Sequence, residues 1–192
     1  MNNQKRTSYA GLAAAAIFIL LGVITKDPYI LHVATIMCIN IILTLSLWLV
    51  FTTGELNLSV VAFMAIGAYS SSLLVMKLGL PFWATLFLAG ILCAVISWLI
   101  GIPALRLKGA YFFIVTLAFA EIIVLIFSSF WVELFGSQTG IIGVPSPNPI
   151  PLPGTTISFV SKTANYYLGL ILMILSVVFF YALSNSRFGR IS

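Results

Sequence analysis

Residues 106–125 read RLKGAYFFIVTLAFAEIIVL, and this stretch decides the fold. The chain has 192 residues with 9 Lys and Arg and 4 Asp and Glu side chains. Three of these charged side chains fall within the stretch: Arg106 and Lys108 at its front, and Glu121 inside an apolar run. An apolar run of this length behind basic residues predicts a transmembrane helix.

The composition excludes an ordinary soluble domain. The chain is 61% hydrophobic and 7% charged, whereas a soluble domain carries about 25% charged residues. Its net charge of +5 comes from scattered Lys and Arg rather than from a basic block. The charge therefore indicates membrane topology and contact with membrane lipid, and no nucleic-acid partner is expected.

Apolar runs of similar length recur along the whole chain. A helix needs about 20 residues to cross the hydrocarbon layer, and backbone groups in lipid must be bonded internally, so each run predicts a helix. We expect an all-α, polytopic membrane protein with about six spans, forming a single membrane domain over residues 1–192. The runs are residues 7–25, 28–54, 56–76, 78–105, 109 to about 130, and 166–184. No convincing A-x-A cleavage site follows the first run, which we interpret as a retained span.

The basic residues predict the orientation. In a six-span arrangement, six of them fall on one side (Lys5, Arg6, Arg106, Lys108, Arg187, Arg190) and three on the other (Lys26, Lys77, Lys162). This bias predicts a cytoplasmic N-terminus. Residues 52–57 are assigned to a cytoplasmic turn although they hold no basic residue. The alternative is a helix that is broken within the membrane.

Residues 131–165 form the one long loop, which the topology places outside the cytoplasm. Proline occupies positions 145, 147, 149, 151 and 153. Alternating proline disfavours helix and predicts an extended segment. Composition alone favours a stiff connector over a docking surface for an external partner.

No catalytic constellation is present. His32 has no acid or nucleophile at suitable spacing, and the chain has no HExxH, GxSxG, P-loop or dinucleotide motif. Cys38 and Cys93 lie in apolar runs without CxxC spacing, which favours packing over a metal or disulfide. We expect no cofactor and no metal. Any ATP hydrolysis must belong to another chain, and an intramembrane enzyme is a disfavoured alternative.

Glu121 lies 13 residues after Lys108, which is about 20 Å along a helix. A charged acid at that depth costs on the order of 2.5–3.5 kcal/mol, and such residues usually face a bundle interior or a watery cavity. A path-lining role is favoured over a structural hydrogen bond. Arg106 and Lys108 are expected to anchor the cytoplasmic end, where Pro103 ends one helix and Gly109 permits the turn into the next.

Small residues cluster in the run over residues 56–76. Gly67 and Ser71 are four residues apart, as are Ala68 and Ser72, and Gly90 with Ala94 repeats the spacing in the next run. Such spacing lets two helices approach closely. Tight packing is the simpler interpretation, and a helix beside a transport path is the alternative.

The sequence GIPALRLKGAYFFIVTLAFAE, residues 101–121, resembles the signature region of LivM-type permeases of bacterial branched-chain amino-acid ABC importers. Three further segments resemble the family in the same order: GELNLSVVAFMAIGAY, TGIIGVP and SRFGR. Asn57, Ser59 and Val60 depart from the family pattern. The resemblance extends from about Ile30 to Arg190.

The resemblance implies a permease subunit in the bacterial inner membrane. Its partners would be a second permease subunit, two cytoplasmic ATPase subunits and a periplasmic or extracellular solute-binding protein. Candidates for the transport path or the permease interface are Glu121, Thr116, Gly67, Ala68, Ser71 and Asn57. Candidates for contact with the binding protein are Gly140, Gly143 and Pro145.

The motifs do not separate branched-chain amino acids from urea or short amides. The chain stops at Ser192, before the cytoplasmic loop that docks the ATPase in the family. We therefore expect the N-terminal portion of a permease. A nonfunctional truncated remnant is the alternative.

Overall fold

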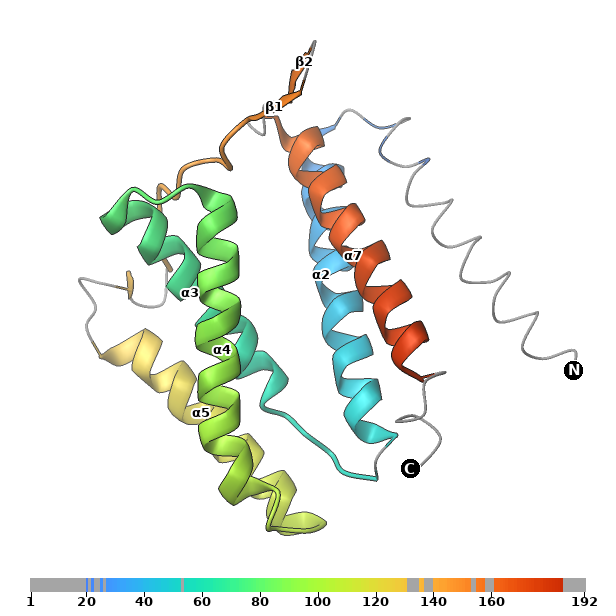
Figure 1. Ribbon diagram of the computed structural model, residues 1–192, viewed down its shortest axis with the longest axis vertical. Helices are drawn as coiled ribbons and strands as arrows, with labels where there is room; N and C mark the ends of the chain where they lie inside the picture. The colour runs from blue at the N-terminus through green and yellow to red at the C-terminus, as the bar shows by residue number, and fades with distance from the viewer. Residues whose placement is uncertain are drawn as a thin grey trace, which may run out of the picture. The chain divides into compact units, whose positions relative to one another are not determined.

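The computed structural model describes residues 20, 22, 25, 27–52, 54–130, 135–136, 140–152, 155–157 and 161–184. The described part contains the helices α2 (Pro28–Phe51), α3 (Val60–Leu78), α4 (Phe82–Ala104), α5 (Ala110–Ser129) and α7 (Lys162–Ser184) (Figure 1). All five are long and apolar enough to cross a membrane. The predicted all-α, polytopic fold is therefore confirmed. The first predicted span, residues 7–25, lies almost entirely outside the described residues.

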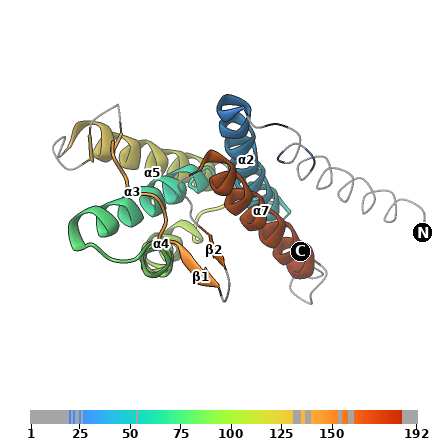
Figure 2. The same ribbon diagram turned by 90° about the horizontal axis from the view of Figure 1, so that it is seen from above.

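Two compact units make up the chain, and each is described by itself. In the first, which comprises residues 1–45 and 158–191, helix α7 packs along α2 (Figures 1 and 2). The contact is built from side chains at helical spacing on both helices: Leu31, Ala34, Cys38, Tyr166, Leu170 and Met173. Gly169 faces Thr35 of α2, since a Cβ there would lie 3.5 Å from the Thr35 methyl, an ordinary van der Waals contact. Cys38 is a free thiol inside this core.

The second unit, residues 46–157, is built on α3, which packs against both α4 and α5. Phe63 of α3 meets Phe119 of α5 with ring centroids 5.5 Å apart, and Tyr69 stacks on Phe127 at 4.3 Å. A Cβ on Gly67 would lie 3.6 Å from the Cys93 sulfur of α4. Gly67 therefore lies in the contact between α3 and α4, where an added Cβ would make an ordinary van der Waals contact.

The turn between α4 and α5 differs slightly from the prediction. Pro103 does not end α4 but lies inside its last turn, and the helix ends at Ala104. Near a helix end, proline removes one backbone hydrogen bond without breaking a continuing ladder. Gly109 precedes α5 with φ +60° and ψ −127°, a conformation open to glycine. This conformation places Gly109 in the turn before α5.

The middle of the long loop is not helical, in line with the alternating prolines, but its end is, because α7 begins at Lys162 rather than at Tyr166. Residues 141–149 have no helix. They lead into an antiparallel hairpin of β1 (Ile150–Leu152) and β2 (Thr155–Ile157), which the prolines did not predict. The Asn148 side chain accepts a 3.0 Å hydrogen bond from the backbone N–H of Phe82. This bond fastens the loop to the start of α4.

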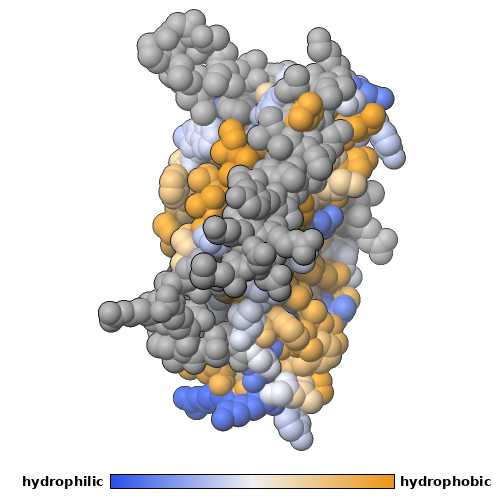
Figure 3. Space-filling model, turned by 90° about the vertical axis from the view of Figure 1, so that its right-hand side faces the viewer, coloured by the Kyte–Doolittle hydropathy of each residue, from blue (hydrophilic) through white to orange (hydrophobic). Residues whose placement is uncertain are grey.

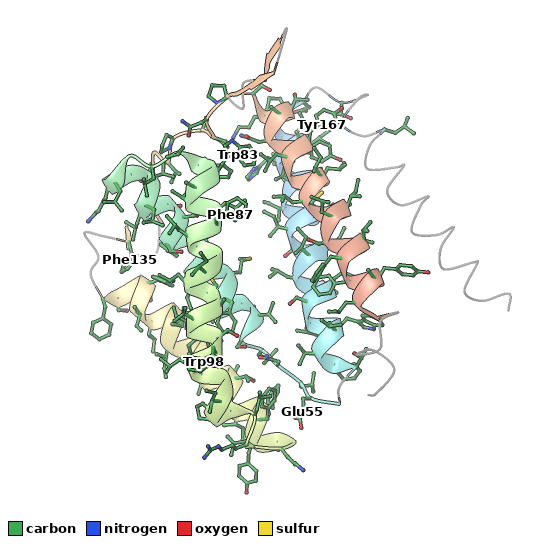
Figure 4. All side chains as sticks on the ribbon, in the orientation of Figure 1. Glu55, Trp83, Phe87, Trp98, Phe135 and Tyr167 are labelled. Carbon is green, nitrogen blue, oxygen red and sulfur yellow. The ribbon has the colours of Figure 1, made fainter. Side chains whose placement is uncertain are left out.

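Many large apolar side chains are exposed on the described part of the chain, and apolar patches are visible on the face shown in Figure 3. The large side chain of Phe87 of α4, for example, is 74% exposed and points outward from the helix (Figure 4). In water this surface would be costly, whereas lipid or neighbouring transmembrane helices can cover it. The exposed apolar faces thus agree with a membrane environment.

Candidate functional site

An irregular segment joins α2 to α3. Helix α2 ends at Phe51, and Gly54 follows with a φ of +85°. Residues 55–58 have no regular structure before α3 begins at Val60. We call residues 54–59 the break segment.

Two hydrogen bonds fix the break segment along α5. The backbone N–H of Gly109 donates to Glu55 Oε1 at 3.4 Å, which holds Glu55 beside the start of α5 (Figure 4). The N–H of Leu58 donates to Thr116 Oγ1 at 3.4 Å. Thr116 lies six residues beyond Ala110, which is about 9 Å along the helix. Non-helical backbone therefore runs beside the first two turns of a predicted span.

The break segment agrees with the second of the two interpretations that the sequence left open, a helix broken within the membrane. Non-helical backbone at membrane depth occurs where it is buried in protein or lines a water-filled cavity. Ser59 is buried and Asn57 is half-buried. A cavity lies directly beside them.

This pocket is an open hollow of about 500 Å³ between the break segment, the C-terminal half of α4 and the N-terminal half of α5. We call it the break pocket. Its polar lining comes from Asn57, Ser59, Ser97 and Thr116. Aromatic side chains form much of the remaining wall: Phe63, Trp98, Phe112 and Phe119. No Asp, Glu, Lys or Arg lines it.

Hydrogen bonds order the polar corner of the pocket. Asn57 Oδ1 accepts from the backbone N–H of Ser59 at 2.8 Å and from the Ser59 hydroxyl. The Thr116 hydroxyl donates to the backbone carbonyl of Phe113 at 2.9 Å, while its oxygen accepts from Leu58. These hydrogen bonds order the corner and leave the amide nitrogen of Asn57 without a hydrogen bond to the described part of the chain.

Two of the six predicted path or interface residues, Asn57 and Thr116, meet at the break pocket. Gly67 lies in the contact between α3 and α4. The Ser71 hydroxyl bonds the carbonyl of Ala68 on its own helix. Ala68 and Ser71 do not line the pocket.

Glu121 lies elsewhere on α5. The face that is buried in this unit carries Phe112, Thr116 and Ala120. Glu121 is five residues beyond Thr116, which turns it about 140° round the helix. Its side chain is exposed, and within the described part of the chain it makes no hydrogen bond or ion pair. The alternative of a hydrogen bond inside its own bundle therefore finds no support among the described residues.

The remaining predicted residues lie at the ends of the second unit. Arg106 and Lys108 are exposed in the turn between α4 and α5, where an anchor was expected. Gly140 and Gly143 adopt positive φ angles of +71° and +84° in the loop. Pro145 is exposed beside them.

Sequence reasoning missed several pocket residues. Ser97 and Trp98 on α4 carry no distinguishing local pattern. On α5 a signal was present: Phe112, Thr116 and Phe119 recur at intervals of four and three, which places them on one helical face. Glu55 also went unnoticed, because its partner, the N–H of Gly109, is 54 positions away.

The family model described as "Branched-chain amino acid transport system / permease component" matches residues 29–192. The chain belongs to this permease family. It is 43% identical over 117 residues to the "High-affinity branched-chain amino acid transport system permease protein LivM" of Escherichia coli K12. It is 44% identical over 117 residues to the protein of the same description in Salmonella typhimurium LT2.

Each of these alignments covers 60% of this chain and 27% of the relative. The chain thus matches about a quarter of the length of these curated relatives. No solved structure matches it. The family and the five long apolar helices together make the chain a multi-pass membrane protein.

Proposed function

We propose that this chain is a permease subunit of a bacterial ABC importer for branched-chain amino acids. It forms part of the solute path and does no chemistry on the solute, while separate cytoplasmic subunits hydrolyse ATP. The observation that carries the proposal is the break pocket. A family of solute permeases gives the expectation of a path, and the pocket offers uncharged polar groups and non-helical backbone beside a transmembrane helix.

The assembly follows from the proposed role. The chain pairs with a second permease subunit, two ATPase subunits and a solute-binding protein in the inner membrane, with its N-terminus in the cytoplasm. The loop residues Gly140, Gly143 and Pro145 are the candidate contact with the binding protein. Gly143 and Pro145 are exposed, which supports a surface that a partner can reach.

Glu121 is assigned to the interface with the second permease. An acid on a transmembrane helix is costly towards lipid and is usually covered by protein or water. Because Glu121 points away from the face of α5 that packs on α3, the covering group must come from outside the described part of this unit. A partner helix that offers a hydrogen-bond donor at the same depth meets this need.

ATP-dependent uptake of radiolabelled leucine tests the proposal. Proteoliposomes would contain the companion permease, the ATPase subunits and the binding protein, with and without this chain. The proposal requires that leucine uptake depend on both this chain and ATP. Uptake of urea or acetamide but not leucine would favour the amide permease alternative, and no uptake of any of these solutes would favour the nonfunctional remnant.

A further inference from the structure

The break pocket has the features of a site for one particular kind of small molecule. Its volume of about 500 Å³ lies within the range of about 300–1,000 Å³ that is typical of small-molecule sites. Such sites join apolar walls to a few converging polar groups. The polar groups of this pocket gather at the break segment, and the aromatic side chains lie around them.

We propose that the break pocket holds a single neutral amino acid with a branched alkyl side chain during transport. The amide nitrogen of Asn57 binds its carboxylate, the hydroxyl oxygen of Ser59 accepts from its ammonium group, and the alkyl group packs against Phe63, Trp98 and Phe119. This inference rests on the proposed transport function and names the solute-selecting residues of the same path.

The hydrogen bonds of Asn57 fix which end of its amide faces a ligand. The backbone N–H of Ser59 can only donate, so the Asn57 atom 2.8 Å away must be the carbonyl oxygen. The amide nitrogen is the other end, and it makes no hydrogen bond to the described part of the chain. Its two N–H groups suit a carboxylate, since hydrogen bonds to an ionised acceptor are the stronger kind.

Ser59 supplies the complementary group. Its hydroxyl hydrogen is used by Asn57 Oδ1, which leaves the lone pairs of the oxygen. A donor on Asn57 and an acceptor on Ser59 are thus two residues apart and joined by hydrogen bonds. An α-amino acid carries its carboxylate and its ammonium group on the same carbon. The donor on Asn57 can therefore meet the carboxylate while the acceptor on Ser59 meets the ammonium group.

The charge and the walls of the pocket select the rest of the solute. A charged side chain would be desolvated in a lining that holds no Asp, Glu, Lys or Arg, and an uncompensated buried charge is costly. A zwitterion with an alkyl side chain carries no net charge into the pocket. Burial of its methyl groups against the aromatic walls makes the free energy of binding more favourable, in proportion to the apolar area removed from water.

The substitution Asn57→Asp tests the polar contact. An aspartate can still accept from the N–H and hydroxyl of Ser59, so the break segment keeps its local bonds, while the donor is lost and a negative charge faces the carboxylate. The matched control is Asn148→Asp, which makes the same chemical change where the side-chain oxygen also accepts a backbone N–H. Asn148 does not line the pocket.

In the reconstituted transporter, Asn57→Asp should lower kcat/KM for leucine uptake at least tenfold, and Asn148→Asp should stay within twofold of the unaltered protein. Equal uptake by the two variants would overturn the inference. Absence of leucine uptake by the unaltered transporter would instead contradict the proposed function, and it leaves the pocket to be judged by binding.

A photoreactive diazirine analogue of leucine provides that binding measurement. After illumination of the assembled transporter in nanodiscs, peptides containing Trp98 or Phe119 should carry the label, and excess leucine should reduce the labelling at least fivefold. Excess lysine or glutamate should leave it unchanged. Labelling that leucine does not reduce, or that lysine reduces equally, would overturn the inference even if uptake is normal.

Discussion

The hydrogen bond between Leu58 and Thr116 can be removed with little change in shape. Thr116→Val replaces the hydroxyl by a methyl group in a side chain that is 5% exposed. The backbone N–H of Leu58 then loses its acceptor 3.4 Å away. An unpaired, partly buried donor costs about 1–3 kcal/mol. Because this bond is long and only partly buried, we expect about 1–2 kcal/mol, or roughly a 5- to 30-fold shift towards an open break segment.

Hydrogen–deuterium exchange measures this opening directly. In nanodiscs, the peptide that covers residues 54–60 should exchange roughly 5- to 30-fold faster in Thr116→Val than in the unaltered chain. Thr116→Ser is the matched control, because it keeps the hydroxyl and should change the exchange less than twofold. Unchanged exchange in Thr116→Val, or equal acceleration in both variants, would refute the claim that Thr116 holds the break segment against α5.

Three further predictions concern the turn, the outer face of α5 and the loop. Gly109→Ala should destabilise the protein by about 1–3 kcal/mol through backbone strain alone, since its Cβ would meet nothing within 4 Å. The control is Gly90→Ala inside α4, where an added Cβ also meets nothing within 4 Å; it should not destabilise the protein. An equal Tm for the two variants would contradict the claim of backbone strain at Gly109. Glu121→Gln should leave the Tm of the isolated subunit unchanged but weaken co-purification of the second permease, and unimpaired co-purification with normal uptake would remove the interface role. Replacing residues 140–145 by a Gly/Ser linker should lower uptake driven by the binding protein, and unchanged uptake would reduce the segment to a connector.

The helices could be predicted from the sequence because lipid simplifies the problem. Charged residues mark the ends of apolar runs, and the run over residues 28–54 became α2 with an error of three residues at one end. Lys108 and Gly109 likewise located the start of α5 to within one residue. Hydrogen bonding inside each span leaves little choice other than helix.

The break segment was harder to place because its few polar residues suit a turn outside the membrane as well as a break within it. Only Gly54, Glu55 and Asn57 hinted at an interruption, and composition could not say whether it lay outside the membrane or within it. Its depth depends on the contact of Leu58 with Thr116, which are 58 residues apart. Pairing at that separation leaves no periodic signal in a single sequence.

The candidate site was predicted only in part, because its residues too are far apart in the sequence. Asn57 and Thr116 entered as separate candidates, but only the packing of α3 and α5 shows that they share a cavity with Ser97 and Trp98. Glu121 drew attention through its chemistry, which is visible in the sequence. Its outward direction depends on which face of α5 packs against α3, and that face is a property of the tertiary structure.

Cysteine labelling tests the central claim, that a water-accessible solute pocket lies beside the break segment. Cys38 and Cys93 would be replaced by alanine, and a single cysteine introduced by Ser97→Cys or, as the control, Val95→Cys. Ser97 lines the pocket. Val95 is exposed on the same helix, α4, but does not line the pocket.

A thiol reacts with a water-soluble methanethiosulfonate only where water lets it ionise. In nanodiscs, Ser97→Cys should be modified at least tenfold faster than Val95→Cys, and leucine should slow only the reaction at position 97. Equal rates at the two positions, or a rate at position 97 that leucine does not change, would contradict the account.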